Sequence, residues 1–406
     1  MLIAAEHLLT AETRAETRAD PRANPTADHV PAPGFVEITG GVISAVGTGM
    51  RPADVTLADG YLLPGFIDLQ VNGYYGVEFQ IADAASWARV MARLPETGTT
   101  ACLPTMITAP VGSLAEALRT AATFMPDLPA SGARVLGVHA EGPFIAPARR
   151  GAHNEKWITD PTPSAVAELS EAGRGALRLV TIAPELPGAL PAIEQLSAAG
   201  VLVSVGHSDA TAAQVAAAAE RGARMVTHLF NAQRPLGHRE PGVVGQALTD
   251  ERLTSGLIVD LHHVAQAVCG LAFRAAPGRI ALVTDAVAAA GMPPGEYLLG
   301  SEMITLPAGD GAPPVRGDGT IAGSALRMDR AVANAVRCGL SLPAAVAAAT
   351  RIPADLIGRP DLGRLRPGAA ADLVWLSPEL RTRATWIAGR LVYTDGAAGT
   401  LAAVPA

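Results

Sequence analysis

The feature that most constrains the fold of this sequence is a repeated alternation of short apolar runs with helical segments across its middle. Segments such as 86–98 and 211–223 carry apolar residues at helical spacing. The apolar runs are short and nearly continuous, as expected of parallel strands that are covered on both faces. The strand candidates are the eight runs 62–71, 99–106, 134–142, 177–185, 201–208, 225–231, 254–260 and 279–286.

Eight strand–helix repeats are the number found in a closed barrel. We therefore predict an α/β protein built on a (β/α)₈ TIM barrel. An open, doubly wound sheet is the alternative fold. The glycine-rich phosphate loop that follows the first strand of that fold is missing from this sequence.

The two ends of the chain have a different pattern. Strand-like pieces punctuated by Gly and Asp occur at residues 1–9, 34–47, 55–63, 370–377 and 384–396. We therefore expect residues 1–61 and 360–406 to form one small β-sandwich domain, and residues 62–359 to form the barrel. The polar stretch 11–33, rich in Ala, Arg, Pro and Asp, is interpreted as a loop insertion.

Charge and composition exclude several classes of function. The formal net charge is −7, and the sequence has no basic stripe for a nucleic-acid partner. No apolar stretch is long enough to span a bilayer, and the N-terminus lacks the pattern of a secretory signal. The three cysteines, Cys102, Cys269 and Cys338, are widely separated, which is typical of reduced thiols. We expect a cytoplasmic protein without membrane association.

Polar residues gather at the carboxyl ends of the strand candidates. In a barrel these ends converge on one face, where the active sites of this fold lie. Burying charged groups without a function is costly, so five or more such strand ends predict a site. The residues are Asp68, Gln70, Asn72, His139, Glu141, His207, His228, Asp260, His262, His263 and Asp285.

Three of these residues form a candidate metal site. Glu141, His207 and His228 each end a different strand candidate. A carboxylate and two neutral imidazoles suit Zn²⁺ or a similar ion, and three protein ligands leave a position for water. A single histidine of this kind is more often a hydrogen-bonded core residue, but two in the settings GHS and THLFN favour a metal. Asp285, at the eighth strand, is the expected general base, or else a carboxylate that orients a ligand histidine.

Longer motifs carry a resemblance to one family. In order, they are LPGFIDLQVNG (63–73), GVHAEGPF (137–144), RRGAHN (149–154), GHSDA (206–210), THLFNA (227–232), REPG (239–242), LVTDA (282–286) and GTIAGSAL (319–326). This set resembles the N-acetylglucosamine-6-phosphate deacetylase family of the amidohydrolase superfamily. PGFID alone is shared by many amidohydrolases, whereas HAEGPF, GHSDA and THLFNA together are specific. The resemblance covers most of residues 60–330.

The resemblance implies hydrolysis of N-acetyl-D-glucosamine 6-phosphate to D-glucosamine 6-phosphate and acetate. It implies that Glu141, His207 and His228 bind one divalent metal, which activates water. Zn²⁺ is expected, although Fe²⁺, Co²⁺ and Mn²⁺ accept the same ligands. Asp285 would accept and return the proton, and His153 would polarise the acetamide carbonyl. A homodimer is also implied.

The resemblance further implies a set of substrate contacts. Arg239 and His263 would suit the phosphate, because a guanidinium fork and an imidazole both pair with its oxygens. Without the resemblance, Arg239 would be interpreted as a solvated loop charge. The implied contacts are Ala152, His153, Asn231, Ala232, Arg239, His263, Ile321, Ala322 and Gly323.

Two positions depart from related patterns. Many amidohydrolases carry HxH at the end of the first strand, where it holds a second metal. Here the place is taken by Gln70, Val71 and Asn72, and amides are poorer transition-metal ligands than imidazoles. We therefore predict a single metal. Gln233 follows THLFNA where the family commonly has Met, at a position expected near the sugar.

Three rival functions can be weighed. Amidohydrolases that bridge two metals with a carboxylated lysine are disfavoured, because the only lysine, Lys156, lies outside every strand candidate. A non-catalytic phosphosugar-binding protein would be expected to lack the ligands or the base, and all of them are present. An N-acetylgalactosamine 6-phosphate hydrolase differs in one hydroxyl of the substrate and stays open.

Overall fold

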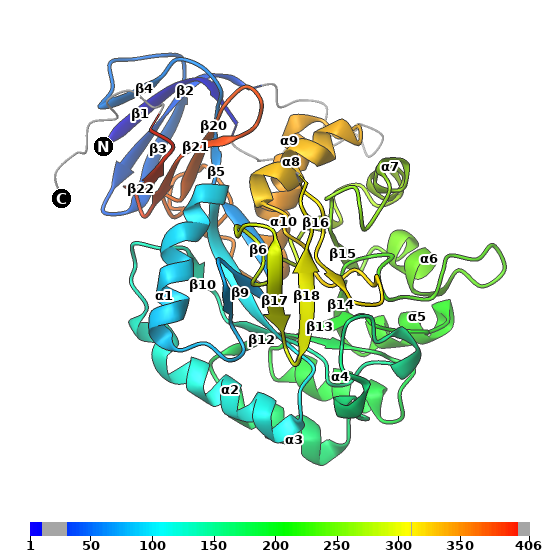
Figure 1. Cartoon of the computed structure of the whole chain (residues 1–406). Coiled ribbons are helices and arrows are strands. Elements are labelled where there is room, and N and C mark those ends of the chain that lie inside the picture. The colour runs from blue at the N-terminus through cyan, green and yellow to red at the C-terminus, as the bar shows by residue number, and fades with distance from the viewer. Residues whose placement is uncertain (10–30, 310, 397–406) are drawn as a thin grey trace.

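The computed structural model describes residues 1–9, 31–309 and 311–396, and its centre is a closed parallel barrel (Figure 1). The barrel strands of the described chain, in order around it, are β6 (Phe66–Val71), β9 (Thr99–Ile107), β11 (Val138–Glu141), β12 (Leu177–Ile182), β13 (Leu202–Val205), β14 (Ala223–Val226), β15 (Thr254–Leu257) and β16 (Ile280–Leu282). A parallel bridge between Val71 and Ala286 joins the last strand to the first. The predicted (β/α)₈ barrel is confirmed.

Helices on the outside of the barrel follow its successive strands (Figure 1). They are α1 (Ala84–Arg93), α2 (Val111–Phe124), α3 (Pro163–Ala172), α4 (Ala189–Ala198), α5 (Ala212–Glu220), α6 (Gly242–Thr249), α7 (Gln266–Ala275) and α8 (Met328–Arg337). Their starts are fixed locally: Thr211 and Gln214 form a reciprocal capping box at α5. Two further helices, α9 (Leu342–Ala349) and α10 (Arg351–Leu356), follow α8, and short 3₁₀ turns occur at η2 (Leu94–Thr97), η3 (Met125–Asp127), η4 (Pro147–Arg149) and η5 (Glu155–Trp157).

The two ends of the chain meet in a second, smaller sheet beside the barrel (Figure 1). Its strands are β22 (Arg390–Thr394), β21 (Thr382–Ile387), β20 (Leu373–Leu376), β5 (Tyr61–Pro64), β1 (Leu2–Leu8), β2 (Ala32–Thr39) and β3 (Val42–Thr48), with β4 (Val55–Leu57) paired to β1. The sheet curls, because the amide of Ile43 in β3 donates to the carbonyl of Ala369, just ahead of β20. It encloses its own apolar cluster, including Trp375 and Trp386.

The strand candidate 62–71 divides between the two sheets. Its first part is β5 in the small sheet and its second part is β6 in the barrel, with Gly65 between them. A Cβ at Gly65 would lie 2.2 Å from the hydroxyl oxygen of Thr100, so the crossing needs glycine. The division of the chain at residues 61/62 and 359/360 stays a prediction. The expected loop over 11–33 falls mostly on residues 10–30, outside the described residues.

Short strands add to the barrel, one beside the first residues of β9 and the others in segments that follow β6 and β16. They are the hairpin β7 (Gly73–Tyr74) and β8 (Val77–Glu78), the strand β10 (Arg134–Val135) beside β9, and the three-stranded sheet of β17 (Gly295–Leu299), β18 (Glu302–Leu306) and β19 (Val315–Arg316). The hairpin β17–β18 packs on Ile107, the last residue of β9, and on Val287, which lies beyond the end of β16. Among the described residues, no helix combines the length and apolar character that crossing a membrane requires.

Candidate active site

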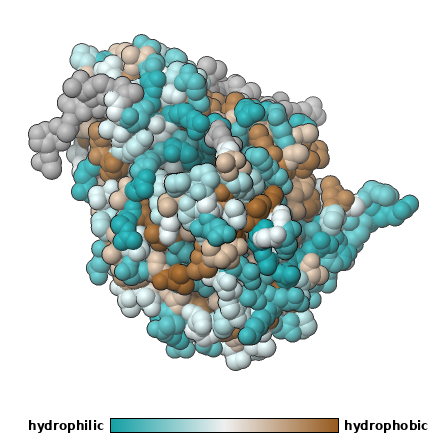
Figure 2. Space-filling view, in the orientation of Figure 1, coloured by the Kyte–Doolittle hydropathy of each residue, from teal (hydrophilic) through white to brown (hydrophobic). Residues whose placement is uncertain are grey.

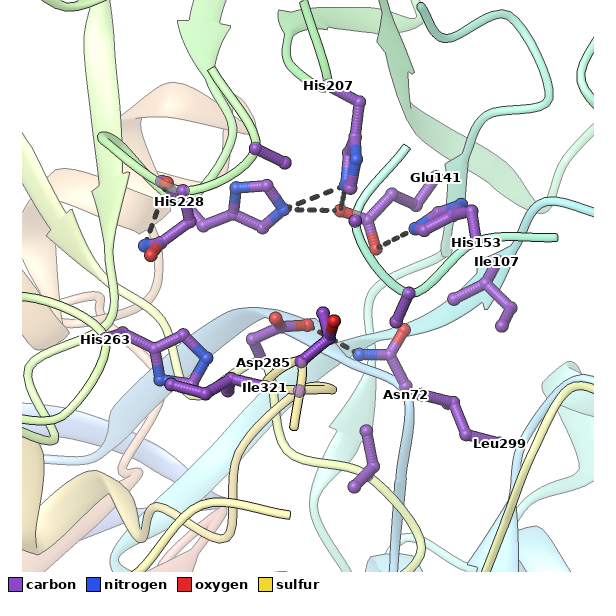
Figure 3. A pocket seen from close by; sticks show the side chains of 17 residues that line it. Asn72, Ile107, Glu141, His153, His207, His228, His263, Asp285, Leu299 and Ile321 are labelled. Atoms are coloured by element: carbon purple, nitrogen blue, oxygen red, sulfur yellow. Dashed lines mark hydrogen bonds and ion pairs between the residues drawn. The ribbon is translucent and has the colours of Figure 1, made fainter. Parts of the chain in front are cut away.

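The carboxyl ends of the barrel strands surround a cavity of about 300 Å³, the size of a small-molecule site (Figure 3). It is lined by Asn72, Ile107, Glu141, Gly151, Ala152, His153, His207, His228, Asn231, Ala232, His263, Asp285, Val287, Leu299, Thr320, Ile321 and Gly323. Of the polar side chains at strand ends, Asn72, Glu141, His207, His228, His263 and Asp285 line this cavity, whereas Asp68, Gln70, His139, Asp260 and His262 do not.

Glu141, His207 and His228 converge on one point of this cavity (Figure 3). The Nε2 atoms of His207 and His228 lie 3.2 Å and 3.0 Å from Oε1 of Glu141, and 3.1 Å from each other. Ligands about 2.0 Å from a tetrahedral ion would be about 3.3 Å apart, so these separations fit one shared cation. All three side chains are buried.

Neighbouring groups hold the ligands in the orientation that a metal needs. The backbone carbonyl of Arg149 accepts a hydrogen bond from Nδ1 of His207 at 3.0 Å, which leaves Nε2 free as a ligand. Gln70 Nε2 donates to Oε1 of Glu141 at 2.9 Å. Of the described residues with metal-ligating side chains, only Glu141, His207 and His228 form such a cluster.

Backbone strain is concentrated at the same residues. His207, His228 and Asp285 have φ values of 47°, 24° and 51°, in the left-handed region that non-glycine residues rarely adopt. Such conformations persist only where the surrounding structure enforces them, and they gather at functional sites. They also explain why the strand candidates overshoot: β13, β14 and β16 end two or three residues before these side chains.

The charges in the cluster influence one another. Burial alone would raise the pKa of Glu141, but the hydrogen bonds and charges of His207 and His228 outweigh burial and hold it well below its usual range. Burial lowers the pKa of His153 to about 3, and the neighbouring His207 adds to this effect. Glu141 is therefore an anionic ligand and His153 is neutral near pH 7.

Asp285 lies beside the cluster and is held by two amides. Asn72 Nδ2 and Gln70 Nε2 both donate to its Oδ1, at 2.7 Å and 3.2 Å. No hydrogen bond within the described chain engages Oδ2. Burial and then the negative charge of Glu141 raise the pKa of Asp285 to about 7. A carboxyl group in this state can both accept and give a proton near neutral pH.

Two supporting residues had no role assigned from the sequence. Thr108 Oγ1 lies 2.7 Å from Nδ1 of His153 and also donates to the backbone carbonyl of Glu141. Asp260 Oδ2 lies 2.6 Å from Nδ1 of His263. Thr108 carries no sequence signal of its own. Asp260 was among the polar strand-end residues, but the sequence alone did not pair it with His263.

The predicted substrate contacts separate into three groups. Ala152, His153, Asn231, Ala232, His263, Ile321 and Gly323 line the cavity. Ala322 is buried behind it in the apolar cluster of the β17–β18 hairpin. Arg239 is exposed on the segment ahead of α6 and does not line the cavity. That segment projects from the body at the right of Figure 1, and the projection is mostly hydrophilic in Figure 2.

Gln233 does not line the cavity either. Its side chain is buried, donates to the carbonyl of Thr227 at 2.8 Å, and accepts from the amide of Phe230 at 3.1 Å. It braces the loop that carries His228. The replacement of the family's common methionine by Gln233 therefore changes the packing of this loop and not a contact with the cavity.

Comparison with known proteins identifies the family. A model of the amidohydrolase family matches residues 61–392. The chain belongs to the amidohydrolase family. This amidohydrolase is 39% identical to the N-acetylglucosamine-6-phosphate deacetylase of Danio rerio, over 82% of this chain and 84% of that protein. It is 38% identical to the N-acetylgalactosamine-6-phosphate deacetylase of Escherichia coli O157:H7, over 88% and 94%.

A solved structure extends the likeness to the whole fold of this amidohydrolase. It matches the N-acetyl-D-glucosamine-6-phosphate deacetylase of Mycobacterium smegmatis with a TM-score of 0.88 and 36% identity, over 97% of this chain and 100% of that one. The lone lysine of the present chain, Lys156, lies in η5, away from the barrel strands. The site therefore lacks the lysine and the first-strand histidines of the two-metal members described above.

Proposed function

We propose that this amidohydrolase hydrolyses N-acetyl-D-glucosamine 6-phosphate to D-glucosamine 6-phosphate and acetate. The observation that carries the proposal is the meeting, in one cavity, of a three-ligand cluster with Asp285 and the neutral His153. Relatives that bear this activity in their names, at 36–39% identity over most of the chain, support the choice of substrate.

Glu141, His207 and His228 would hold one divalent cation, and Zn²⁺ is the ion we propose. Such a cation supplies Lewis-acid activation of water at neutral pH. Asp285, whose Oδ2 is open, accepts the proton that water loses as its oxygen bonds to the acetamide carbon. His153 would polarise that carbonyl in its Nε2–H tautomer, in which the Thr108 hydroxyl donates to Nδ1 in place of the Glu141 backbone carbonyl, and its Nε2 then donates to the oxygen where negative charge develops.

Asp285 then returns its proton to the amide nitrogen as the carbon–nitrogen bond breaks. The proton is needed because an unprotonated amine is a poor leaving group. Water supplies its oxygen and one proton to acetic acid, which ionises to acetate near neutral pH, and its other proton to the amine, so the products are acetate and D-glucosamine 6-phosphate. Gln70 and Asn72 keep Oδ1 of Asp285 engaged throughout.

The phosphate would lie at the side of the cavity where His263 and Asn231 are placed. Arg239 is too exposed to contact it from the same subunit in the observed loop conformation. We therefore propose a homodimer in which the projecting segment of one subunit brings Arg239 to the site of its partner. A cytoplasmic location is part of the proposal, and three buried, unpaired cysteines support it.

The test is product analysis by NMR on metal-loaded protein with N-acetylglucosamine and N-acetylgalactosamine, each with and without the 6-phosphate. The proposal predicts acetate and glucosamine 6-phosphate, with little turnover of the unphosphorylated sugars. Faster release from the galacto isomer would favour the second candidate, the activity named for the Escherichia coli relative. No acetate from any of the four would contradict the proposed reaction.

A further inference from the structure

One wall of the cavity is apolar and consists of Ile107, Val287 and Leu299. Each comes from an element tied to the chemistry of the site. Ile107 ends β9 and is the register partner of the ligand Glu141. Val287 follows the base Asp285 by two residues, and Leu299 ends β17 in the hairpin at the cavity mouth.

This wall lies opposite the polar side of the cavity. In Figure 3, Ile107 is beside His153, whereas His263 is on the far side of Asp285. His263 and Asn231 offer hydrogen bonds, while Ile107, Val287 and Leu299 offer none. An amide carbon placed between the ligand cluster and Asp285 would therefore have one polar and one apolar neighbourhood.

We propose that Ile107, Val287 and Leu299 form an acyl pocket that admits the methyl group of an acetamide and rejects longer or charged acyl groups. The inference rests on the proposed function, because the sugar and its phosphate must occupy the His263 side. The acyl group then points to the apolar wall on the other side of Asp285 from His263 and Ile321 (Figure 3). A carboxylate there, as in a succinyl group, would be desolvated without a partner.

The wall is backed so firmly that it cannot retreat from a longer chain. All three side chains belong to one buried cluster with Ala289, Ile304, Leu306 and Ala322. A Cβ at Gly300 would lie 3.0 Å from Cδ1 of Ile107, so the hairpin turn packs directly on that residue. Glu78 Oε1 accepts from the amide of Gly300 at 2.9 Å and fastens the turn. Well-packed interiors resist added methylene groups.

The test measures kcat/KM for the N-acetyl, N-propionyl and N-butyryl derivatives of glucosamine 6-phosphate. Leu299→Ala and Ile107→Val enlarge the pocket at two independent elements. Leu298→Ala is the matched control, because Leu298 is the adjacent residue of β17 and is 41% exposed. Thermal melting of each variant checks that the hairpin and barrel stay folded.

We expect the wild type to disfavour each added methylene by about 10- to 200-fold, the range a tight apolar pocket gives. Leu299→Ala should raise the propionyl-to-acetyl ratio by about tenfold or more, Ile107→Val by less, and Leu298→Ala should leave it unchanged. An unchanged ratio in both wall variants, with acetate release intact, would overturn the acyl pocket while leaving the proposed reaction standing. Wall variants that change only the preference for phosphorylated over unphosphorylated sugars would overturn the acyl pocket as well. Absence of acetate release from the wild type would instead overturn the proposed function and this inference together.

Discussion

Asn72 donates a hydrogen bond from Nδ2 to Oδ1 of Asp285 at 2.7 Å, across the seam where the last barrel strand meets the first. Gln70 donates to the same oxygen and also to Glu141. Two amides thus donate to two neighbouring carboxylates, at the place where many amidohydrolases carry the HxH motif. Amides at these positions are consistent with one metal per chain.

Replacement of Asp285 by Asn should remove proton transfer and leave the ligand cluster in place. Because general acid–base catalysis contributes about 10²–10⁴-fold, kcat should fall by that factor. Acetate release and metal content are measured on the same preparation. Near-normal turnover with normal metal content would show that Asp285 is not the base.

Asn72→Ala should shift the acid limb of the pH–rate profile upward. The hydrogen bond from Asn72 favours the carboxylate form and lowers the pKa of Asp285, so its loss raises that pKa. The base must be ionised, and activity falls as the pH drops through its pKa. In the wild type a cation held by Glu141, His207 and His228 would add to the effect of Asn72, so we expect the limb below about 7. An unshifted acid limb in Asn72→Ala would mean that the ionisation seen in the pH–rate profile does not belong to Asp285.

Asp260→Asn should weaken binding of the phosphorylated substrate with little effect on kcat. Asp260 fixes the ring of His263 through Nδ1 at 2.6 Å, and its own pKa is held low, chiefly by His263 against the opposing effect of burial. Loss of this charge-assisted hydrogen bond should cost about 1–3 kcal/mol, or roughly 5- to 150-fold in KM. His262→Ala is the control, because His262 contacts Asp260 through its backbone amide. A lower kcat at unchanged KM would contradict a phosphate-side role.

Arg239→Ala and Asp285→Asn subunits should complement each other if sites are shared. Each homodimer would be impaired, but a heterodimer would contain one site with an intact Asp285 and an Arg239 from the partner. Co-expression with two different tags and purification on both isolates the heterodimer. Activity above the average of the two homodimers is expected. Activity equal to that average would mean that Arg239 acts within its own subunit or not at all.

The sequence brought the candidate ligands and the candidate base to one face, because barrel topology brings strand ends together. The apolar runs place His207, His228 and Asp285 at strand ends, and the chemistry of their side chains and the family resemblance predict their roles. Thr108 and Leu299 could not, since their roles depend on partners that only the folded chain supplies. Thr108 pairs with His153, and Leu299 reaches the cavity through a hairpin whose own pattern does not show where it packs.

Arg239 illustrates a different limit of sequence reasoning. The REPG motif indicates a phosphate contact by resemblance, but it does not say from which subunit the residue approaches. Gln233 is a similar case. It follows the THLFNA motif, but the sequence does not show that its side chain turns inward and bonds to the loop backbone. The motifs indicated that Arg239 and Gln233 belong to segments near the site, whereas the direction in which each side chain points depends on tertiary packing.

The most direct test of the central claim is a titration of metal-free protein with Zn²⁺, with acetate release from N-acetylglucosamine 6-phosphate as the readout. If Glu141, His207 and His228 hold the catalytic ion, activity should rise linearly and reach a plateau at one equivalent per chain. His228→Asn should abolish that rise. Full activity in the metal-free protein, or a plateau only at two equivalents, would contradict a single-metal site.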